Sequence, residues 1–552
     1  MTVQVAKPLL RVGIIIDSFV QPRWMRKSLE NAVAAGVSTF ELVVKVPAEK
    51  NVEESLLYKL YNRMDRSMFV AKCDAMEPVS IEDLVGSLPS LQRDETDKIK
   101  AFNLDVLISF AQTDLKSRFA GLAKYGVWFY AFGSDDKAPP GFRELFSWDP
   151  LTISSLKSLN GQTSGERIIY QSFSPTLTKF SVGLNNNECY WKSAAFVARS
   201  LVDLHSGREY SAIEDMERTG GSLEPTNALV SRMFFKLTER AASRLVEKLS
   251  SFEQWVLAYR IGDSEFKYLE PPSDRFWADP FPITVAGKYY IFFEDYLNSS
   301  GRAHISVIEV DQTGIVSGPT EVLRMDCHLS YPFVFEWGGD YYMIPETGDK
   351  NVVELYRSVS FPAGWQFEKV LLEAKSPLDT TLVEVDGTWW MFVNIQEEGV
   401  LVNWDELHLY YADSPLGPWK PHARNPVVSD VRSARPAGRL FWSDNVLYRP
   451  SQNSSMRYGY AIAVNRITSL SPTEYAETQV AKILPGWDKD ILGVHTLNTA
   501  NELTVIDCLV KRRRFRIGKL RPPPALGITE NLLRDQISVA SKVKTGRQRR
   551  GI

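Results

Sequence analysis

The chain has 552 residues, of which 44% are hydrophobic, 24% are charged and 12% are aromatic. This hydrophobic fraction supports packed cores and excludes a wholly disordered or fibrous chain. The formal net charge is −3, from 64 basic and 67 acidic residues, which argues against a general binder of nucleic acid. At about 150 residues per domain, the length predicts two large domains or three to four smaller ones.

Short apolar runs alternate with helical stretches in the first part of the chain. RVGIIIDSF is followed by the helical WMRKSLENAVAAG, then by the apolar runs FELVVKV, LDVLISFA and YGVWFYAFG. Strand, helix and strand at this spacing predict an α/β domain with a parallel sheet, which we place at residues 1–215. Apolar residues then recur every three or four positions, as at Leu229, Met233 and Leu237, and predict a linker helix within 216–251.

Residues 252–515 repeat a pattern of a strand, a tight turn and an aromatic-rich strand. The copies begin with WADPF, SYPFV, LDTTL, ARPAG and GVHTL, and their lead residues are Asp279, Tyr331, Asp379, Arg435 and His495. The separations between lead residues are 52, 48, 56 and 60, with a mean of 54. Five units of this length predict a five-bladed β-propeller. We expect the strand QWVLAYRIG, residues 254–262, to form the outer strand of the last blade and so close the ring.

Equivalent positions on the inner strands of a propeller converge on the central channel. Glycosyl chemistry requires carboxylates there, one acting as a base on the attacking oxygen and another protonating or orienting the leaving group. We therefore predict catalytic roles for Asp279, Glu346 and Asp379. Arginines suit a phosphate or carboxylate of the ligand, and tryptophans can stack on sugar rings. The residues predicted to bind substrate are Glu294, Tyr331, Arg435, Arg439, Arg449, His495 and Trp277.

Each of these residues also has a structural interpretation. Asp and Glu at blade entrances can cap turns or accept backbone hydrogen bonds. A histidine such as His495 can be a satisfied buried imidazole, and tryptophans are more often part of a core than a binding platform. No metal ligand set is predicted and no cofactor is required. The triplet Asp488-Lys489-Asp490 leaves a divalent metal as the alternative, because Asp-x-Asp can hold a metal and a pyrophosphate.

Several motifs resemble the glucosamine inositolphosphorylceramide transferase N-terminal family. They are FWADPFP, IPETGDKNVVELYR, RPSQNSSMRYGYAI and GVHTLN, with GVWFYAFGSDDKAPPGFRELF and NNNECYWKSAAFVARSL upstream. The resemblance covers roughly residues 10–510. It implies a formyltransferase-like, Rossmann-like α/β domain followed by the propeller. The propeller is also similar, more distantly, to invertase- and arabinanase-like glycosidases, in which an Asp matching Asp279 acts as nucleophile or base.

Two departures from these families shape the expected function. Plant members of the transferase family carry a separate glycosyltransferase domain after the propeller, and we expect none here, so any activity is expected to lie in the two predicted domains. Formyltransferases use Asn-x-His where this chain reads Val127-Trp128-Phe129-Tyr130. Folate-dependent formyl transfer is therefore not expected, and this domain is interpreted as nucleotide-binding or structural.

Three functions remain open from the sequence. The first is a glycosyltransferase of polysaccharide or glycolipid synthesis, with its active site in the propeller channel, a sugar donor such as a sugar nucleotide, and a glycan or glycolipid acceptor. The second is a propeller-type glycoside hydrolase, and the third is a non-catalytic sugar-binding scaffold. No signal peptide or transmembrane run is recognised, so we expect a cytoplasmic chain. The basic, Pro-containing tail at 516–552 is interpreted as a solvated extension, with peripheral membrane contact as the alternative.

Overall fold

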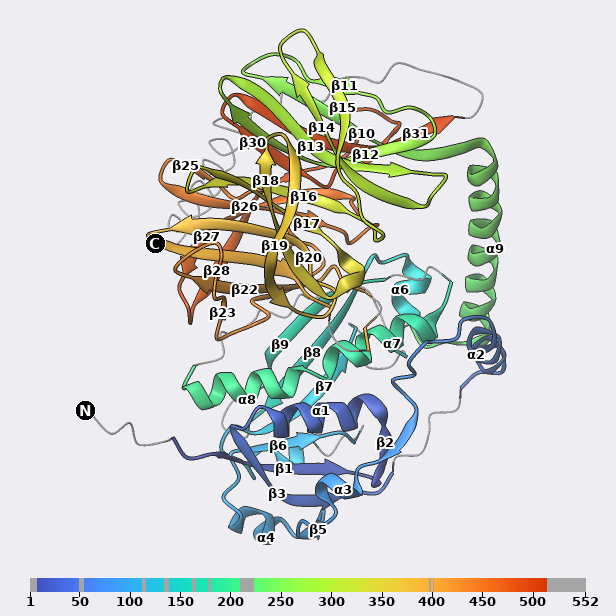
Figure 1. Ribbon diagram of the computed structural model, residues 1–552. Coiled ribbons are helices and arrows are strands. Elements are labelled where there is room, and N and C mark those ends of the chain that lie inside the picture. The colour runs from blue at the N-terminus through green and yellow to red at the C-terminus, as the bar shows by residue number, and fades with distance from the viewer. Residues whose placement is uncertain are drawn as a thin grey trace, which may run out of the picture. The chain divides into compact units, whose positions relative to one another are not determined.

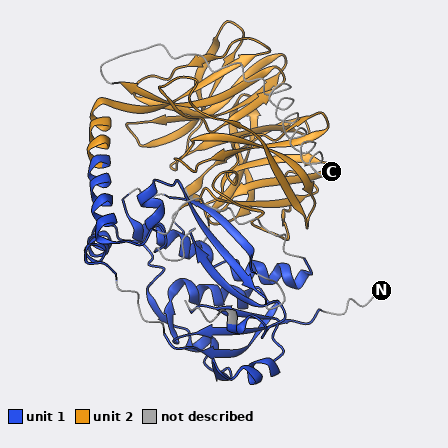
Figure 2. Ribbon diagram, turned by 180° about the vertical axis from the view of Figure 1, so that it is seen from behind, with its two compact units in different colours: residues 1–240, 398–401 blue, residues 241–397, 402–552 orange. Residues whose placement is uncertain are grey.

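The structure is a computed structural model. It describes residues 7–48, 54–111, 116–133, 139–160, 165–176, 180–208, 223–396, 399–400 and 402–513. The chain divides into two compact units, residues 1–240 with 398–401 and residues 241–397 with 402–552 (Figure 2). The C-terminal tail predicted at 516–552 lies outside the described residues. No helix within the described ranges is both long and apolar enough to cross a membrane.

The first unit is built on a seven-stranded mixed sheet (Figure 1). In spatial order its strands are β5 (Ser90–Gln92), β3 (Ser38–Lys45), β1 (Leu10–Ile16), β6 (Val106–Ser109), β7 (Val127–Phe132), β8 (Leu151–Leu159) and β9 (Glu166–Pro175). The first five are parallel to one another, while β8 and β9 are antiparallel. A separate short pair is formed by β2 (Val20–Pro22) and β4 (Pro78–Ser80). The predicted α/β class is confirmed.

Both faces of this sheet are covered, because successive side chains of a strand point to opposite faces. Ile14 of β1 joins a core that includes residues of α1 and α8, whereas its neighbour Ile15 joins the core on the other face with residues of α4 and α5. The helices of this unit are α1 (Arg23–Ala34), α2 (Leu56–Met68), α3 (Glu82–Val85), α4 (Thr96–Ala101), α5 (Lys116–Phe119), α6 (Phe142–Ser147), α7 (Val182–Ser193) and α8 (Phe196–Ser206). The helix α9 (Asn227–Ser250) runs across the boundary between the two units.

The second unit is a five-bladed β-propeller, as predicted (Figure 1). Blade 1 contains β12 (Arg275–Val285), β13 (Lys288–Leu297), β14 (Arg302–Val310) and β15 (Ile315–Leu323). Blade 2 contains β16 (Ser330–Trp337), β17 (Asp340–Glu346), β18 (Val352–Ser360) and β19 (Ala363–Glu373). Blade 3 contains β20 (Leu378–Val385), β21 (Thr388–Asn394), β22 (Glu406–Ala412), β23 (Lys420–Pro421) and β24 (Val428–Ser429). Blade 4 contains β25 (Phe441–Ser443), β26 (Val446–Asn453), β27 (Ala461–Leu470) and β28 (Tyr475–Ile483).

Blade 5 is assembled from both ends of the propeller segment. It combines β29 (Ile491–Gly493), β30 (Leu497–Ala500) and β31 (Leu503–Arg513) with β10 (Ser251–Ile261) and β11 (Lys267–Leu269). β10 pairs with β31 along its whole length, so the predicted joining of the two ends is confirmed. The predicted outer position of β10 is wrong, because the short β11 turns back and pairs with its free edge.

Hydrophobic clusters hold neighbouring blades together all the way round the ring. One cluster joins blade 5 to blade 1 through Leu257 and Trp277, and the next joins blades 1 and 2 through Phe292 and Val334. The remaining junctions contain Phe333 and Met391 between blades 2 and 3, Phe392 and Tyr475 between blades 3 and 4, and Ile462 and Val510 between blades 4 and 5. The aromatic-rich second strands of the repeat therefore supply much of this inter-blade core.

A β-bulge recurs at the lead position of the first three blades. The pairing register shifts around Asp279 in β12, Tyr331 in β16 and Asp379 in β20. Each of these residues has a positive φ, of 49°, 44° and 52° respectively. A positive φ is unusual for a residue with a side chain and costs on the order of 1–3 kcal/mol at each position. The bulge places one extra residue on the inner strand and so redirects the lead side chain.

Candidate functional site: an acidic cavity at the centre of the propeller

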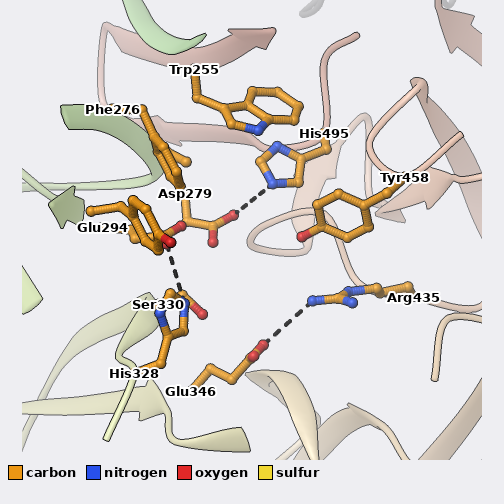
Figure 3. A pocket seen from close by; sticks show the side chains of 12 residues that line it. Trp255, Phe276, Asp279, Glu294, His328, Ser330, Glu346, Arg435, Tyr458 and His495 are labelled. Carbon is orange, nitrogen blue, oxygen red and sulfur yellow. Dashed lines mark hydrogen bonds and ion pairs between the residues drawn. The ribbon is translucent and has the colours of Figure 1, made fainter. Parts of the chain in front are cut away.

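Residues of blades 1, 2, 4 and 5 enclose a cavity of about 210 Å³ (Figure 3). Its polar lining includes three carboxyl groups and two basic side chains, namely Asp279, Glu294, Glu346, Arg435 and His495. The remaining walls contain the aromatic rings of Trp255, Phe276, Tyr296 and Tyr458, together with Ala278, His328 and Ser330. Five of the ten side chains predicted from the sequence therefore face one space.

Asp279 lies at one end of a buried ion-pair chain whose middle member is His495. Its Oδ1 is 3.4 Å from Nε2 of His495, whose Nδ1 is 2.7 Å from Oδ2 of Asp507. Oδ1 of Asp279 also accepts a hydrogen bond from the hydroxyl of Thr496 at 2.8 Å. The ring of His495 stacks on Trp255, with 4.1 Å between the ring centroids. Figure 3 shows Asp279 and His495 meeting on one side of the cavity.

Asp507 fixes the backbone around this chain. Its carboxylate accepts hydrogen bonds from the backbone N–H groups of Asp279, His495 and Thr496, each at 3.0 Å. One fully buried side chain therefore links the strained lead position of blade 1 to the lead position of blade 5. Because three backbone donors and an imidazole surround it, the carboxylate of Asp507 is well satisfied without water.

The pKa values of Asp279 and His495 reflect burial and mutual contact. Burial raises the pKa of Asp279 to about 7, helped by nearby carboxylates and opposed by His495. Burial alone would lower the pKa of His495, but the carboxylates of Asp507 and Asp279 outweigh it and raise the pKa to about 9. At neutral pH, His495 is therefore a cation, while Asp279 titrates in the range where a general base is most effective.

Arg435 joins the two other predicted catalytic carboxyls. Its Nε and Nη2 donate to the two oxygens of Asp379 at 2.5 and 3.2 Å, and Nη2 lies 3.5 Å from Oε2 of Glu346 (Figure 3). Gln452 donates a further hydrogen bond to Asp379 at 2.8 Å. Asp379 itself is not part of the cavity lining, so it anchors Arg435 from behind. Burial and the neighbouring Asp379 raise the pKa of Glu346 well above its usual range, against the opposing effect of Arg435.

A second imidazole faces the third carboxyl group. Nε2 of His328 is 3.2 Å from Oε1 of Glu294, and Nδ1 of His328 accepts a hydrogen bond from the backbone N–H of Ala303. Because Nδ1 is the acceptor, the proton of a neutral ring sits on Nε2 and points at Glu294. Glu294 is thus oriented by a donor that does not need to be charged.

Tyr331 occupies the lead position of blade 2 but is fully buried and does not line the cavity. Its hydroxyl is 2.9 Å from Oγ1 of Thr381 in blade 3 and accepts a hydrogen bond from the backbone N–H of Gly438, beside blade 4, at 2.7 Å. The ring therefore spans the axis and ties three blades together. The structure gives Tyr331 a packing role in place of the predicted contact with substrate.

Three other predicted binding residues also lie away from the cavity. Arg449 is completely buried inside blade 4, where it binds both oxygens of Glu477 at 2.8 and 2.6 Å. Arg439 donates to the carbonyl of Val334 and lies over the ring of Phe333, 4.8 Å from its centroid. Trp277 packs in the cluster between blades 5 and 1.

Sequence reasoning did not select several residues of the site, most notably Asp507, His328 and Tyr458. Asp507 lies on the second strand of blade 5, and Glu294 and Glu346 lie on the corresponding strands of blades 1 and 2. Asp507 follows its lead residue by 12 positions, whereas Glu294 and Glu346 follow theirs by 15. The shorter spacing concealed the equivalence. His328 precedes β16 and Tyr458 lies between β26 and β27, so both belong to connections outside the repeated pattern.

The buried ion-pair chain of Asp279, His495 and Asp507 is also a candidate cation site. One ligand atom from each of Asp279, His495 and Asp507 lies within 4.8 Å of the others. The oxygens of Asp507 already accept three backbone hydrogen bonds, and the cationic state of His495 opposes metal coordination at neutral pH. These contacts fit an internal ion-pair chain better than a metal centre.

The fold and the cavity together define the class of protein: an α/β unit followed by a five-bladed propeller with an acidic pocket at its centre. Residues 264–498 match the family described as "Glucosamine inositolphosphorylceramide transferase 1, N-terminal". The predicted resemblance to this family is thereby confirmed for the propeller.

Two plant proteins illustrate the extent of the similarity. "Glucosamine inositolphosphorylceramide transferase 1" of Oryza sativa subsp. japonica is 39% identical over 210 residues, which cover 37% of this chain and 28% of the rice protein. The Arabidopsis thaliana protein of the same name is 37% identical over 210 residues, covering 37% of this chain and 27% of that protein. The chain thus matches less than a third of the length of these curated relatives.

Solved structures that match part of this chain include glycoside hydrolases. A thermostable family-43 glycoside hydrolase is 10% identical with a TM-score of 0.32, and the match covers 43% of this chain and 88% of that chain. A family 117 glycoside hydrolase from Zobellia galactanivorans is 15% identical with a TM-score of 0.31, covering 47% of this chain and 90% of that chain.

Proposed function

We propose that this chain is a glycosyltransferase of glycolipid or polysaccharide synthesis, and that its propeller cavity is where the sugar is transferred. The observation that carries the proposal is the convergence of three carboxyl groups, Arg435 and His495 on one cavity with aromatic walls. The match to proteins named glucosamine inositolphosphorylceramide transferase supports a sugar donor and a glycolipid acceptor.

The proposed roles follow from the charge state of each group. Asp279, with a pKa near 7, is the base that takes the proton of the acceptor hydroxyl. His495 stays protonated beside it and stabilises the ionised form of Asp279. Glu346, whose pKa is raised, remains protonated and orients or protonates the leaving group.

Arg435 supplies the positive charge that a phosphate-containing leaving group requires. Its guanidinium is held by Asp379 and Glu346 and faces the cavity with the ring of Tyr458 at 5.1 Å. A fixed, desolvated guanidinium stabilises developing negative charge without having to reorganise. We assign no step to the α/β unit beyond the expectation that it binds a nucleotide or is structural.

Hydrolysis of a glycosidic bond is the second candidate. The observation that favours it is a pair of carboxyl groups with raised pKa values, Asp279 and Glu346, contributed to one cavity by adjacent blades. A hydrolase uses this same acid and base pairing, with water as the acceptor.

Incubation of the full chain with a panel of sugar nucleotides tests the proposal. Transfer predicts release of a nucleoside diphosphate that increases with a glycolipid acceptor and is lost in D279N, while D279N still binds the donor. Cleavage of an oligosaccharide without nucleotide release from any donor supports the hydrolase instead. Ligand binding without turnover by the native chain, unchanged in D279N, supports the non-catalytic scaffold.

A further inference from the structure

Helix α2 has two apolar faces, although a surface helix of a globular unit usually needs only one. Its inner face packs against the core of the first unit through Tyr58 and Tyr61, which belong to a cluster with Phe142, Val182 and Met233. The hydroxyl of Tyr61 accepts a hydrogen bond from the backbone N–H of Val182 at 3.0 Å. The inner face of α2 is therefore part of the core of the first unit.

The outer face carries a stripe of apolar side chains that nothing in the described chain covers. Leu56, Leu60, Met64 and Met68 follow one another at intervals of four residues and are 43–77% exposed. Residues four apart lie on the same side of a helix, so these side chains form one continuous surface. Single exposed apolar residues are ordinary, but an aligned set of four along a helix is typical of an interaction surface.

All of the exposed charges on α2 are positive. Lys59, Arg63 and Arg66 are exposed, and none of them forms an ion pair with a described residue. The one carboxylate of the helix, Asp65, is buried and accepts a hydrogen bond from the backbone N–H of Gly183 at 2.8 Å. At about 100° per residue, the three cations fall together on one flank of the apolar stripe. The outer surface of α2 is therefore apolar along its centre and cationic along one edge.

This combination selects one kind of partner. An apolar stripe flanked by Lys and Arg is the pattern of helices that lie in a lipid–water interface, with the apolar residues among the acyl chains and the cations at anionic headgroups. A second copy of the same helix is disfavoured, because pairing two α2 stripes brings like charges together.

We propose that α2 docks this chain on a membrane surface containing anionic lipid. The stripe formed by Leu56, Leu60, Met64 and Met68 enters the interface, and Lys59, Arg63 and Arg66 contact the headgroups. This inference is independent of the proposed function, because vesicle binding is measured without turnover.

Co-sedimentation of the full chain with vesicles tests the docking. We expect binding to vesicles of phosphatidylcholine with about 30% phosphatidylglycerol, weaker binding to phosphatidylcholine alone, and weakening with salt. The K59Q/R63Q variant is expected to bind about 25-fold more weakly, at ~5-fold for each cation near an anionic surface. The L60Q/M64Q variant is expected to lose at least about 10-fold, because two side chains no longer enter the apolar layer.

Matched controls separate this site from general charge and hydrophobicity. K98Q/K100Q removes two charges from α4 of the same unit, and V316Q/V359Q removes two exposed apolar side chains from the propeller. R547Q/R549Q/R550Q tests the C-terminal tail. All three are expected to bind as the native chain does, and thermal unfolding checks that every variant is folded.

Several results overturn the proposal. They are failure of the native chain to bind anionic vesicles, equal binding by the native chain and both α2 variants, or loss of binding in the tail variant alone. A concentration-dependent dimer that L60Q/M64Q dissolves in sedimentation velocity would assign the stripe to self-association.

Discussion

Replacement of Asp279 by Asn removes a buried negative charge and keeps the shape of the side chain. The carboxyl is 4% exposed, and burial raises its pKa from 3.8 to about 7. Holding it ionised in the folded propeller at pH 8 therefore costs about 4 kcal/mol relative to the unfolded chain, at about 1.36 kcal/mol for each pKa unit. This value already includes the attraction of His495.

The sign of the effect depends on pH. A carboxyl whose folded pKa is raised stabilises the folded state below the unfolded pKa, and this contribution is lost as the pH rises through about 7. The D279N variant resembles the protonated acid at every pH. We therefore expect nearly equal stability of the two proteins at pH 4, and a variant more stable by about 4 kcal/mol at pH 8.

Thermal unfolding of both proteins at the two pH values measures this difference. For a unit of this size, about 4 kcal/mol corresponds to a rise in Tm of roughly 8 to 16 °C. Replacement of the exposed Asp263 by Asn is the control and should leave Tm unchanged at both values. If D279N is less stable at pH 8, the carboxylate is a structural anchor of the bulge, and the argument that Asp279 is held ready for chemistry fails.

Other substitutions separate the chemical from the structural residues. His495→Gln should destabilise the propeller by about 3 kcal/mol below pH 6.5, and the difference should shrink as the pH rises through about 9. The reason is that the folded propeller stabilises only the protonated form of His495. Urea unfolding across this pH range measures the difference. Arg435→Met leaves Asp379 and Glu346 without their cation and should lower the free energy of unfolding by ~3–5 kcal/mol, which calorimetry measures. The same variant should lose donor binding, which a binding titration measures. Arg449→Met should destabilise the propeller by a similar ~3–5 kcal/mol, yet the refolded or low-temperature protein should bind donor normally, since this side chain does not reach the cavity. Normal donor binding by the Arg435 variant, or its loss in the Arg449 variant, contradicts this division.

The blade count could be predicted because each blade needs the same local pieces. A tight turn between an inner strand and an aromatic-rich second strand recurs about every 54 residues, and the aromatic side chains become the contacts between neighbouring blades. The alternation of apolar runs and helices likewise predicted the parallel part of the first sheet. The edge strand β11 was missed, because three residues carry too little alternation to be recognised.

The site was only partly predictable, because a repeat gives equivalent backbone positions and not equivalent side-chain directions. Asp279 and Tyr331 occupy the same bulge in neighbouring blades, yet one faces the cavity and the other spans the axis. Sequence spacing cannot distinguish them, since the difference depends on what the opposite blades leave open. His328 and Tyr458 reach the cavity from connections between strands, whose course no periodic pattern describes.

The charges of the cavity and its surroundings explain why the propeller keeps a costly arrangement. Four carboxyl groups, from Asp279, Glu294, Asp379 and Asp507, are buried around two cations, Arg435 and His495, and a fifth, from Glu346, is 10% exposed beside them. Full ionisation would leave an excess of negative charge in a poorly solvated space, so protons must remain on some of the acids. Asp379 and Asp507 have the strongest partners, a bidentate guanidinium and three backbone N–H groups. Burial raises the pKa of Asp279 and of Glu346, and both of these carboxyls face the cavity, which is why proton transfer in this propeller is expected to pass through them.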